Sequence, residues 1–248
     1  MSSTRFSELA TDVRQGLSIG LAIVAIVIPA STAQAPPAIA ATSSFSTPRF
    51  ADFTSTQNMP SPDARFLANW VADSRNNDGG NAGFIIIDKK FARVYVFDAS
   101  GRLRADSAVL LGGARGDDSV EGIGNRPIEQ VRPEERTTPA GRFVAEPGRN
   151  MLGEDVVWID YDAAVSMHRV RLTNPAERRL ERLATPTADD NRISYGCINV
   201  PVTFYETYIR PAAAKRRAII YVLPEVHSLQ QVFGAYDVAA ARGVRPAP

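Results

Sequence analysis

The sequence predicts a mainly β fold, a sandwich or barrel with a few short helices. Short apolar runs rich in β-branched and aromatic residues recur between residues 84 and 222. Turn-forming residues separate these runs, a pattern typical of mainly β domains. No internal repeat is visible, and residues 63–248 are a length that one domain can fill.

The first two strands are expected at residues 84–87 and 93–97, and the polar Asp88-Lys89-Lys90 between them predicts a hairpin. The sequence Asp98-Ala99-Ser100-Gly101 has turn chemistry, which places a third strand at residues 108–111. Further strands are expected at residues 142–144, 156–159, 165–172 and 219–222.

Two helices are expected among these strands. Asn174 is a capping residue, Pro175 suits the first helical position and Glu177 the third, so a helix should begin there. Leu180 and Leu183 would form its narrow apolar edge. A second helix should begin near Pro201 and direct three aromatic side chains toward the core: Phe204, Tyr205 and Tyr208.

The first 35 residues have the order of a secretory signal peptide. Arg5 and Arg14 precede an apolar stretch at residues 17–28, and Ala33-Gln34-Ala35 follows as a small-residue cleavage site. The stretch is shorter than the roughly 20 apolar residues of a membrane span. We therefore expect cleavage after Ala35 and export to the periplasm or cell envelope, with no membrane span left. Acidic residues in the basic region keep an uncleaved anchor as the alternative.

Residues 36–62 are rich in Ala, Ser, Thr and Pro, which predicts a flexible linker ahead of a domain at residues 63–248. The formal net charge is +1, and this near balance argues against a general nucleic-acid binder. The sequence leaves the oligomeric state open.

Cys197 is the only cysteine of the 248-residue chain, so it has no internal disulfide partner. Gly196 precedes it and allows a sharp backbone turn that brings N–H groups near the sulfur. A thiol needs a base or a positive environment to act as a nucleophile. Two other readings stay open here: a small buried hydrophobe and a disulfide to another chain.

His168 is the candidate base, on a predicted strand whose same face carries Ser166, Val170 and Leu172. A structural histidine is the alternative. The other histidine, His227, is assigned to the surface. Two histidines and one cysteine without close ligand spacing do not make a usual zinc site, so no metal is expected.

Residues 194–199, Ser-Tyr-Gly-Cys-Ile-Asn, resemble the Ser/Thr-His-Gly-Cys-x-Asn signature of the L,D-transpeptidase (YkuD-like) family. His168 falls where that family has its upstream histidine, and residues 138–143 resemble its Thr-Pro-x-Gly-x-Phe turn and strand. Residues 84–112 are similar to its opening strands. The resemblance covers roughly residues 80–223, and four features in the right order are more specific than any one alone.

The resemblance implies a bacterial envelope β-sandwich that acts on peptidoglycan stem peptides without a metal or organic cofactor. Cys197 would attack a carbonyl next to a terminal D-amino acid and form a thioester, with His168 moving the proton. An amine from a second stem would resolve the thioester into a cross-link. The backbone N–H groups of Tyr195, Gly196 and Cys197 would hold the oxyanion.

Further residues are expected to support the site. Ser194 and Asn199 would either support the catalytic group or merely shape the loop. Thr138, Gly141 and Arg136 are candidates for substrate binding, although a charged run such as residues 132–136 is usually a solvated face. The charged stretch at residues 113–136 is expected to be a long exposed loop beside the groove.

Three departures from the family pattern stand out. Tyr195 replaces the usual histidine, and a phenol is a poor base at neutral pH. The separation between His168 and Cys197 is longer than usual, and the helix expected from Pro175 accounts for the extra residues. Arg169 follows the histidine where a smaller residue is common, but the orienting group there is a backbone carbonyl, which Arg also supplies.

Two other functions fit the same residues. The scaffold could hydrolyse stem peptides as a carboxypeptidase instead of joining them. Tyr195 could mark a non-catalytic peptidoglycan-binding module. Trp70 and Trp158 fit either the core or a cleft, and the sequence does not choose between these positions.

Overall fold

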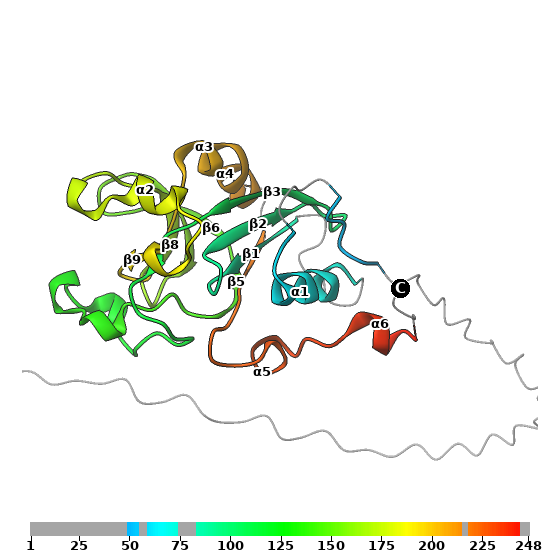
Figure 1. The fold of residues 1–248 in the computed structure, drawn as a ribbon. Helices are drawn as coiled ribbons and strands as arrows, with labels where there is room; N and C mark the ends of the chain where they lie inside the picture. The colour runs from blue at the N-terminus through cyan, green and yellow to red at the C-terminus, as the bar shows by residue number, and fades with distance from the viewer. Residues whose placement is uncertain (1–48, 55–58, 74–82, 215–217, 244–248) are drawn as a thin grey trace, which may run out of the picture. The chain divides into compact units, whose positions relative to one another are not determined.

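A computed structural model describes residues 49–54, 59–73, 83–214 and 218–243 (Figure 1). The expected signal peptide and residues 36–48 of the expected linker lie outside the described residues. The described part of that linker belongs to the fold, because Asp52 exchanges backbone hydrogen bonds with Gly101 and Leu103. Ala51 and Phe53 pack against a buried cluster. The packed region therefore begins before residue 63.

Five strands form the first sheet. Their spatial order is β3 (Leu103–Ala108), β2 (Arg93–Phe97), β1 (Phe84–Asp88), β11 (Ile219–Val222) and β5 (Gly141–Val144). The pair β1–β11 is parallel and the other neighbours are antiparallel. The β1–β2 hairpin predicted from the polar turn is confirmed.

Four strands form the second sheet, in the order β10 (Ile198–Val200), β8 (Val165–Arg169), β7 (Asp155–Asp160) and β6 (Glu146–Arg149). β8 and β10 are parallel, and their register sets His168 opposite Asn199. A short parallel pair joins β4 (Leu111–Gly112) to β9 (Arg192–Ser194). Residues 195–197 thus connect β9 of the small pair to β10 of the second sheet.

The main core lies between the two sheets, so the predicted mainly β sandwich is confirmed. Alternation along β1 shows why: Ile85 and Ile87 face a cluster that includes Val157 and Met167 of the second sheet. The opposite face of β1 packs against α1 (Pro62–Ala72), which carries Leu67 into a second cluster. Figure 1 shows α1 alongside the first sheet. Both faces of β1 are therefore buried.

The remaining helical segments are short. The chain after β10 is helical through α3 (Val202–Phe204), the π-helix η6 (Tyr205–Ile209) and α4 (Arg210–Ala214). The C-terminal region holds α5 (Leu229–Phe233) and α6 (Val238–Ala241). The loop before β5 contains three 3-10 turns: η1 (Ile123–Asn125), η2 (Ile128–Gln130) and η3 (Pro133–Glu135). No helix within the described residues is both long and apolar enough to cross a membrane.

The predicted helix after Asn174 is interrupted. Asn174 caps a 3-10 turn, η4 (Pro175–Glu177), but Arg178 then adopts a left-handed conformation. The α-helix proper, α2 (Arg179–Ala184), starts only after it. Leu180 is exposed, so the expected apolar edge does not face the core. Another short 3-10 turn, η5 (Asp189–Asn191), leads into β9.

The third strand was placed too late in the chain. Residues 103–108 form β3, so the expected strand at 108–111 overlaps β3 only at Ala108 and the short β4 only at Leu111. Arg104 and Asp106 interrupt the apolar run, so a search for apolar runs does not detect this strand. In the structure Asp106 forms an ion pair with Arg93 of β2 across the sheet. The strand expected at residues 165–172 ends at Arg169.

A buried group of charges joins four segments next to β9. The side chain of Lys89 is fully buried, and its Nζ donates to Asp117 Oδ1 and to the Thr138 carbonyl, both at 2.9 Å. Asp117 accepts backbone N–H bonds from residues 225–227, and Arg192 pairs with Glu225. These bonds fix residues 116–117 and 138 against the start of β9.

Replacing Lys89 by Met should cost about 3–5 kcal/mol of unfolding free energy, because the buried Asp117 carboxylate loses its cation. The neighbouring pair of Lys90 and Asp63 is solvent-exposed, so Lys90→Met should cost less than about 1 kcal/mol. Urea denaturation of the two variants measures the difference. Equal losses would contradict the structural importance of the buried group.

Candidate active site

Cys197 lies in a tight loop that only a glycine allows. Gly196 has φ +129°, and a Cβ on it would lie 2.7 Å from the Thr137 carbonyl oxygen. That contact is closer than Cβ atoms tolerate, and the φ value is one that L side chains rarely adopt. The backbone in front of Cys197 is thus held in a conformation that the Gly–Cys sequence makes accessible.

Side chains on both sides of the loop hold the Cys197 carbonyl. Ser194 Oγ donates to this oxygen at 2.6 Å and accepts the Gly196 N–H at 3.1 Å. Asn199 Nδ2 also donates to it, at 3.3 Å, and Arg179 Nη1 donates to Asn199 Oδ1 at 2.7 Å. Ser194 and Asn199 are both buried. Their hydrogen bonds orient the peptide that carries the thiol.

Thr138 supports this loop from behind. Its hydroxyl donates to the Gly196 carbonyl at 2.8 Å and accepts the Gly112 N–H at 2.9 Å, and the residue is 1% exposed. Gly141 begins β5 and pairs with Val222, away from the groove that Cys197 lines. Neither Thr138 nor Gly141 is among the residues that line this groove.

The Cys197 sulfur is half-buried beside β8. Its Sγ lies 3.7 Å from Ser166 Oγ and 3.7 Å from the Ala164 carbonyl oxygen. Burial acts to raise the pKa of the Cys197 thiol, but the hydrogen bond and charge of His168, with hydrogen bonds from Ser166, outweigh it. The pKa is therefore lowered, which favours the thiolate.

His168 is oriented by its own neighbour in the chain. The His168 Nδ1 lies 2.8 Å from the Arg169 carbonyl oxygen, which can only accept a hydrogen bond. In the neutral ring Nδ1 thus carries the proton, and Nε2 is free to accept one. The Arg169 side chain turns elsewhere, to Asp155 and Glu206. The structure thus uses the Arg169 backbone for orientation.

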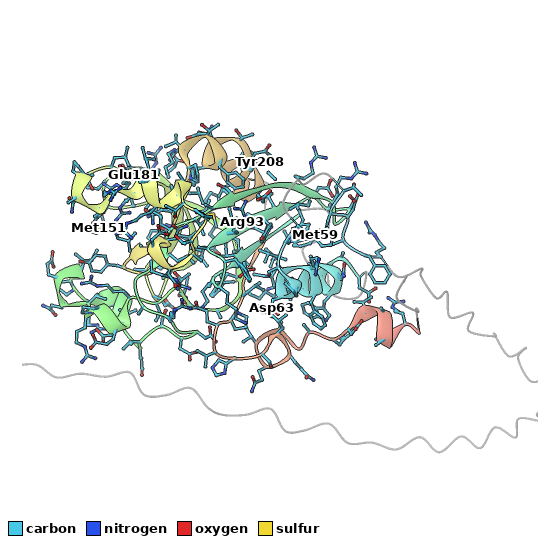
Figure 2. All side chains as sticks on the ribbon, in the orientation of Figure 1. Met59, Asp63, Arg93, Met151, Glu181 and Tyr208 are labelled. Carbon is cyan, nitrogen blue, oxygen red and sulfur yellow. The ribbon has the colours of Figure 1, made fainter. Side chains whose placement is uncertain are left out.

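Cys197 and His168 line the same groove, of about 460 Å³. Met151, which borders it, lies at the outer edge of the molecule (Figure 2). Trp158 faces this groove, whereas Trp70 packs against the cluster under α1. The full lining comprises Ile128, Asn150, Met151, Leu152, Trp158, Ala164, Ser166, His168, Arg171, Thr173, Arg179, Ser194, Tyr195, Cys197 and Asn199.

Tyr195 is exposed, and the Arg136 guanidinium carbon lies 4.0 Å from the centroid of its ring. This geometry is a cation–π contact, so Arg136 reaches the site through Tyr195. The expected oxyanion donors differ in availability. The Gly196 N–H is engaged by Ser194, whereas the N–H groups of Tyr195 and Cys197 have no protein partner among the described residues.

The loop at residues 113–136 borders the groove through Ile128 and is internally braced. Arg132 and Arg126 both donate to the Glu135 carboxylate. Hydrogen bonds from Arg132, followed by those from Arg126, lower the pKa of Glu135 to about 2. Most of the loop is exposed or half-buried, in line with the expectation, but Glu135 is buried. Its carboxylate braces the loop and is absent from the groove lining.

Sequence reasoning missed several lining residues. Strand periodicity places Ser166 on the same face as His168, but it does not predict the contact of Ser166 with the Cys197 sulfur. No sequence signal indicates the hydrogen bond of Arg179 to Asn199. His227 lies 3.9 Å from Asp118 and lines no part of this groove. Within the described ranges, no three His, Cys, Asp or Glu side chains gather as metal ligands.

The rate of Cys197 alkylation by iodoacetamide should rise with pH around a midpoint below the ordinary thiol value of 9.0. In His168→Gln the midpoint should move to higher pH, because burial then acts on the thiol without the imidazole. His227→Gln is the matched control and should leave the midpoint in place. An unchanged midpoint in His168→Gln would show that the imidazole does not stabilise the thiolate.

No family model and no curated protein matches the chain. An L,D-transpeptidase from Mycobacterium smegmatis aligns over 57% of this chain and 58% of its own, with 14% identity and a TM-score of 0.35. The helical cell shape determining protein of Campylobacter jejuni aligns over 68% and 58%, with 13% identity and a TM-score of 0.37. Two other solved structures that the chain matches are each covered over only about half of their own length, 49% and 50%. Similarity this low assigns neither a family nor an activity.

Proposed function

We propose that the chain is an exported cysteine peptidyltransferase of the L,D-transpeptidase type that acts on peptidoglycan stem peptides. The observation that carries the proposal is the pairing of Cys197 with His168 in one groove, with the imidazole Nδ1 held by the Arg169 carbonyl. A thiol with a lowered pKa beside an oriented base is the arrangement that acyl transfer requires. The motif at residues 194–199 supports the same assignment.

In the first step the Cys197 thiol gives its proton to His168 Nε2, and the sulfur attacks the carbonyl carbon of the donor stem peptide. The backbone N–H groups of Tyr195 and Cys197 are the available donors to the oxyanion. The C–N bond then breaks, and the departing amine takes the proton from His168. The products are a Cys197 thioester and a released amino acid.

In the second step an amine of another stem attacks the thioester and loses a proton through His168, and the Cys197 sulfur leaves. The product is a cross-link, and no cofactor takes part. With water as the attacking group the same residues would hydrolyse the donor, so a carboxypeptidase is the second candidate. Cys197 is half-buried, so either an amine or water can reach its thioester. Residues 1–35 favour a periplasmic or cell-envelope location.

Incubation with a carbapenem, a mechanism-based acylator of this family, should add one drug mass to the wild-type protein and none to Cys197→Ala. The expected adduct is a thioester on Cys197, which intact-mass analysis and peptide mapping locate. Absence of an adduct on folded wild-type protein, together with no amino-acid release from tetrapeptides, would overturn the proposed function.

Purified muropeptides separate the candidate activities. A transferase should yield cross-linked dimers, and a hydrolase should yield trimmed monomers only. Cys197→Ala should abolish both products, because no thioester forms. A binding module would give a different result. The wild-type protein would bind sacculi but leave the muropeptides unconverted, and Cys197→Ala would bind sacculi equally well.

A further inference from the structure

Two arginine side chains line the groove that holds Cys197. They are Arg171 and Arg179, and the lining includes no Asp or Glu. Both arginines follow β8 in the long segment that separates His168 from Cys197. Each arginine has a glutamate partner, Glu154 for Arg171 and Glu177 for Arg179, and both glutamates lie outside this lining.

Arg179 is anchored in a way that leaves part of its guanidinium available. Its Nε pairs with Glu177, and its Nη1 donates to Asn199. Its Nη2 has no hydrogen-bond partner among the described residues. The side chain is 16% exposed, so it is held in place while still bordering the groove.

Arg171 is held more loosely. Its Nε lies 3.6 Å from Glu154 Oε2, in a pair whose two side chains are both substantially exposed. Exposed pairs of this kind are weak, so an incoming carboxylate can compete for the guanidinium. A planar guanidinium suits the two oxygens of a carboxylate better than an ammonium does.

We propose that Arg171 and Arg179 form a carboxylate-binding subsite that makes the groove selective for peptides with a free carboxylate on the departing residue. The inference rests on the proposed function for the identity of the peptide. The charge selectivity itself belongs to the groove and can be measured without any peptide. Amidation of that carboxylate should remove the advantage, because a carboxamide carries no charge.

Two alkylating reagents of nearly equal size test the subsite directly. Iodoacetate is anionic and iodoacetamide is neutral, and both react with the Cys197 sulfur. The measured quantity is the rate with iodoacetate divided by the rate with iodoacetamide. This ratio should be roughly three- to tenfold higher for Cys197 in the wild-type protein than for a small neutral thiol. The ratio should fall toward that of the small thiol in Arg171→Gln/Arg179→Gln.

Arg104→Gln is the matched control. Arg104 is exposed, lies on β3 and does not line the groove, so this variant should keep the wild-type ratio. Arg171→Lys/Arg179→Lys should keep part of it, since the charge remains. If the double Gln variant does not fold, raising the salt to about 1 M, where the Debye length is about 3 Å, should lower the wild-type ratio.

A wild-type ratio equal to that of the small thiol, or one that neither salt nor the double variant lowers, would overturn the subsite. A tetrapeptide and its C-terminal amide then link the subsite to turnover, with kcat/KM favouring the acid. If neither peptide reacts but the alkylation ratio behaves as expected, the proposed function fails while the anion subsite stands.

Discussion

The parallel pairing of β8 with β10 is the constraint on which the candidate site depends. It sets His168 opposite Asn199, two residues after Cys197, so the imidazole and the thiol reach the same groove despite the long segment between them. Strand register is fixed by the buried face of a sheet, and Met167 and Ile198 provide that face here. The geometry of the thiol is therefore a consequence of core packing.

The loop that carries the thiol is held from several directions. Thr138 binds the Gly196 carbonyl, and the Thr138 carbonyl in turn accepts a bond from the buried Lys89. On the other side Arg179 reaches the Cys197 carbonyl through Asn199. These bonds come from segments far apart in the sequence, and together they hold the backbone around a glycine whose conformation is otherwise unfavourable. Such support is what a preorganised reactive group requires.

The sequence predicted the elements with strong local signals and missed those that depend on the tertiary structure. The runs at residues 84–87, 93–97 and 219–222 are strands because continuous apolar residues suit a layer buried on both faces. The strand β3 was missed because its polar residues pair across the sheet. Cys197 and His168 were identifiable from their residue types and a motif, whereas Thr138 required coordinates to show that its hydroxyl faces the loop. The hydrogen bond from Arg179 to Asn199 likewise required coordinates.

The central claim is that the Cys197 thiol and the His168 imidazole interact within one groove. The chain has only two histidines, so nitrogen-15 NMR of labelled histidine resolves both imidazoles. Alkylation of Cys197 should shift the ring nitrogens of His168, the one in contact with the sulfur, and leave those of His227 unchanged. Two unchanged imidazole spectra after complete alkylation would contradict the account.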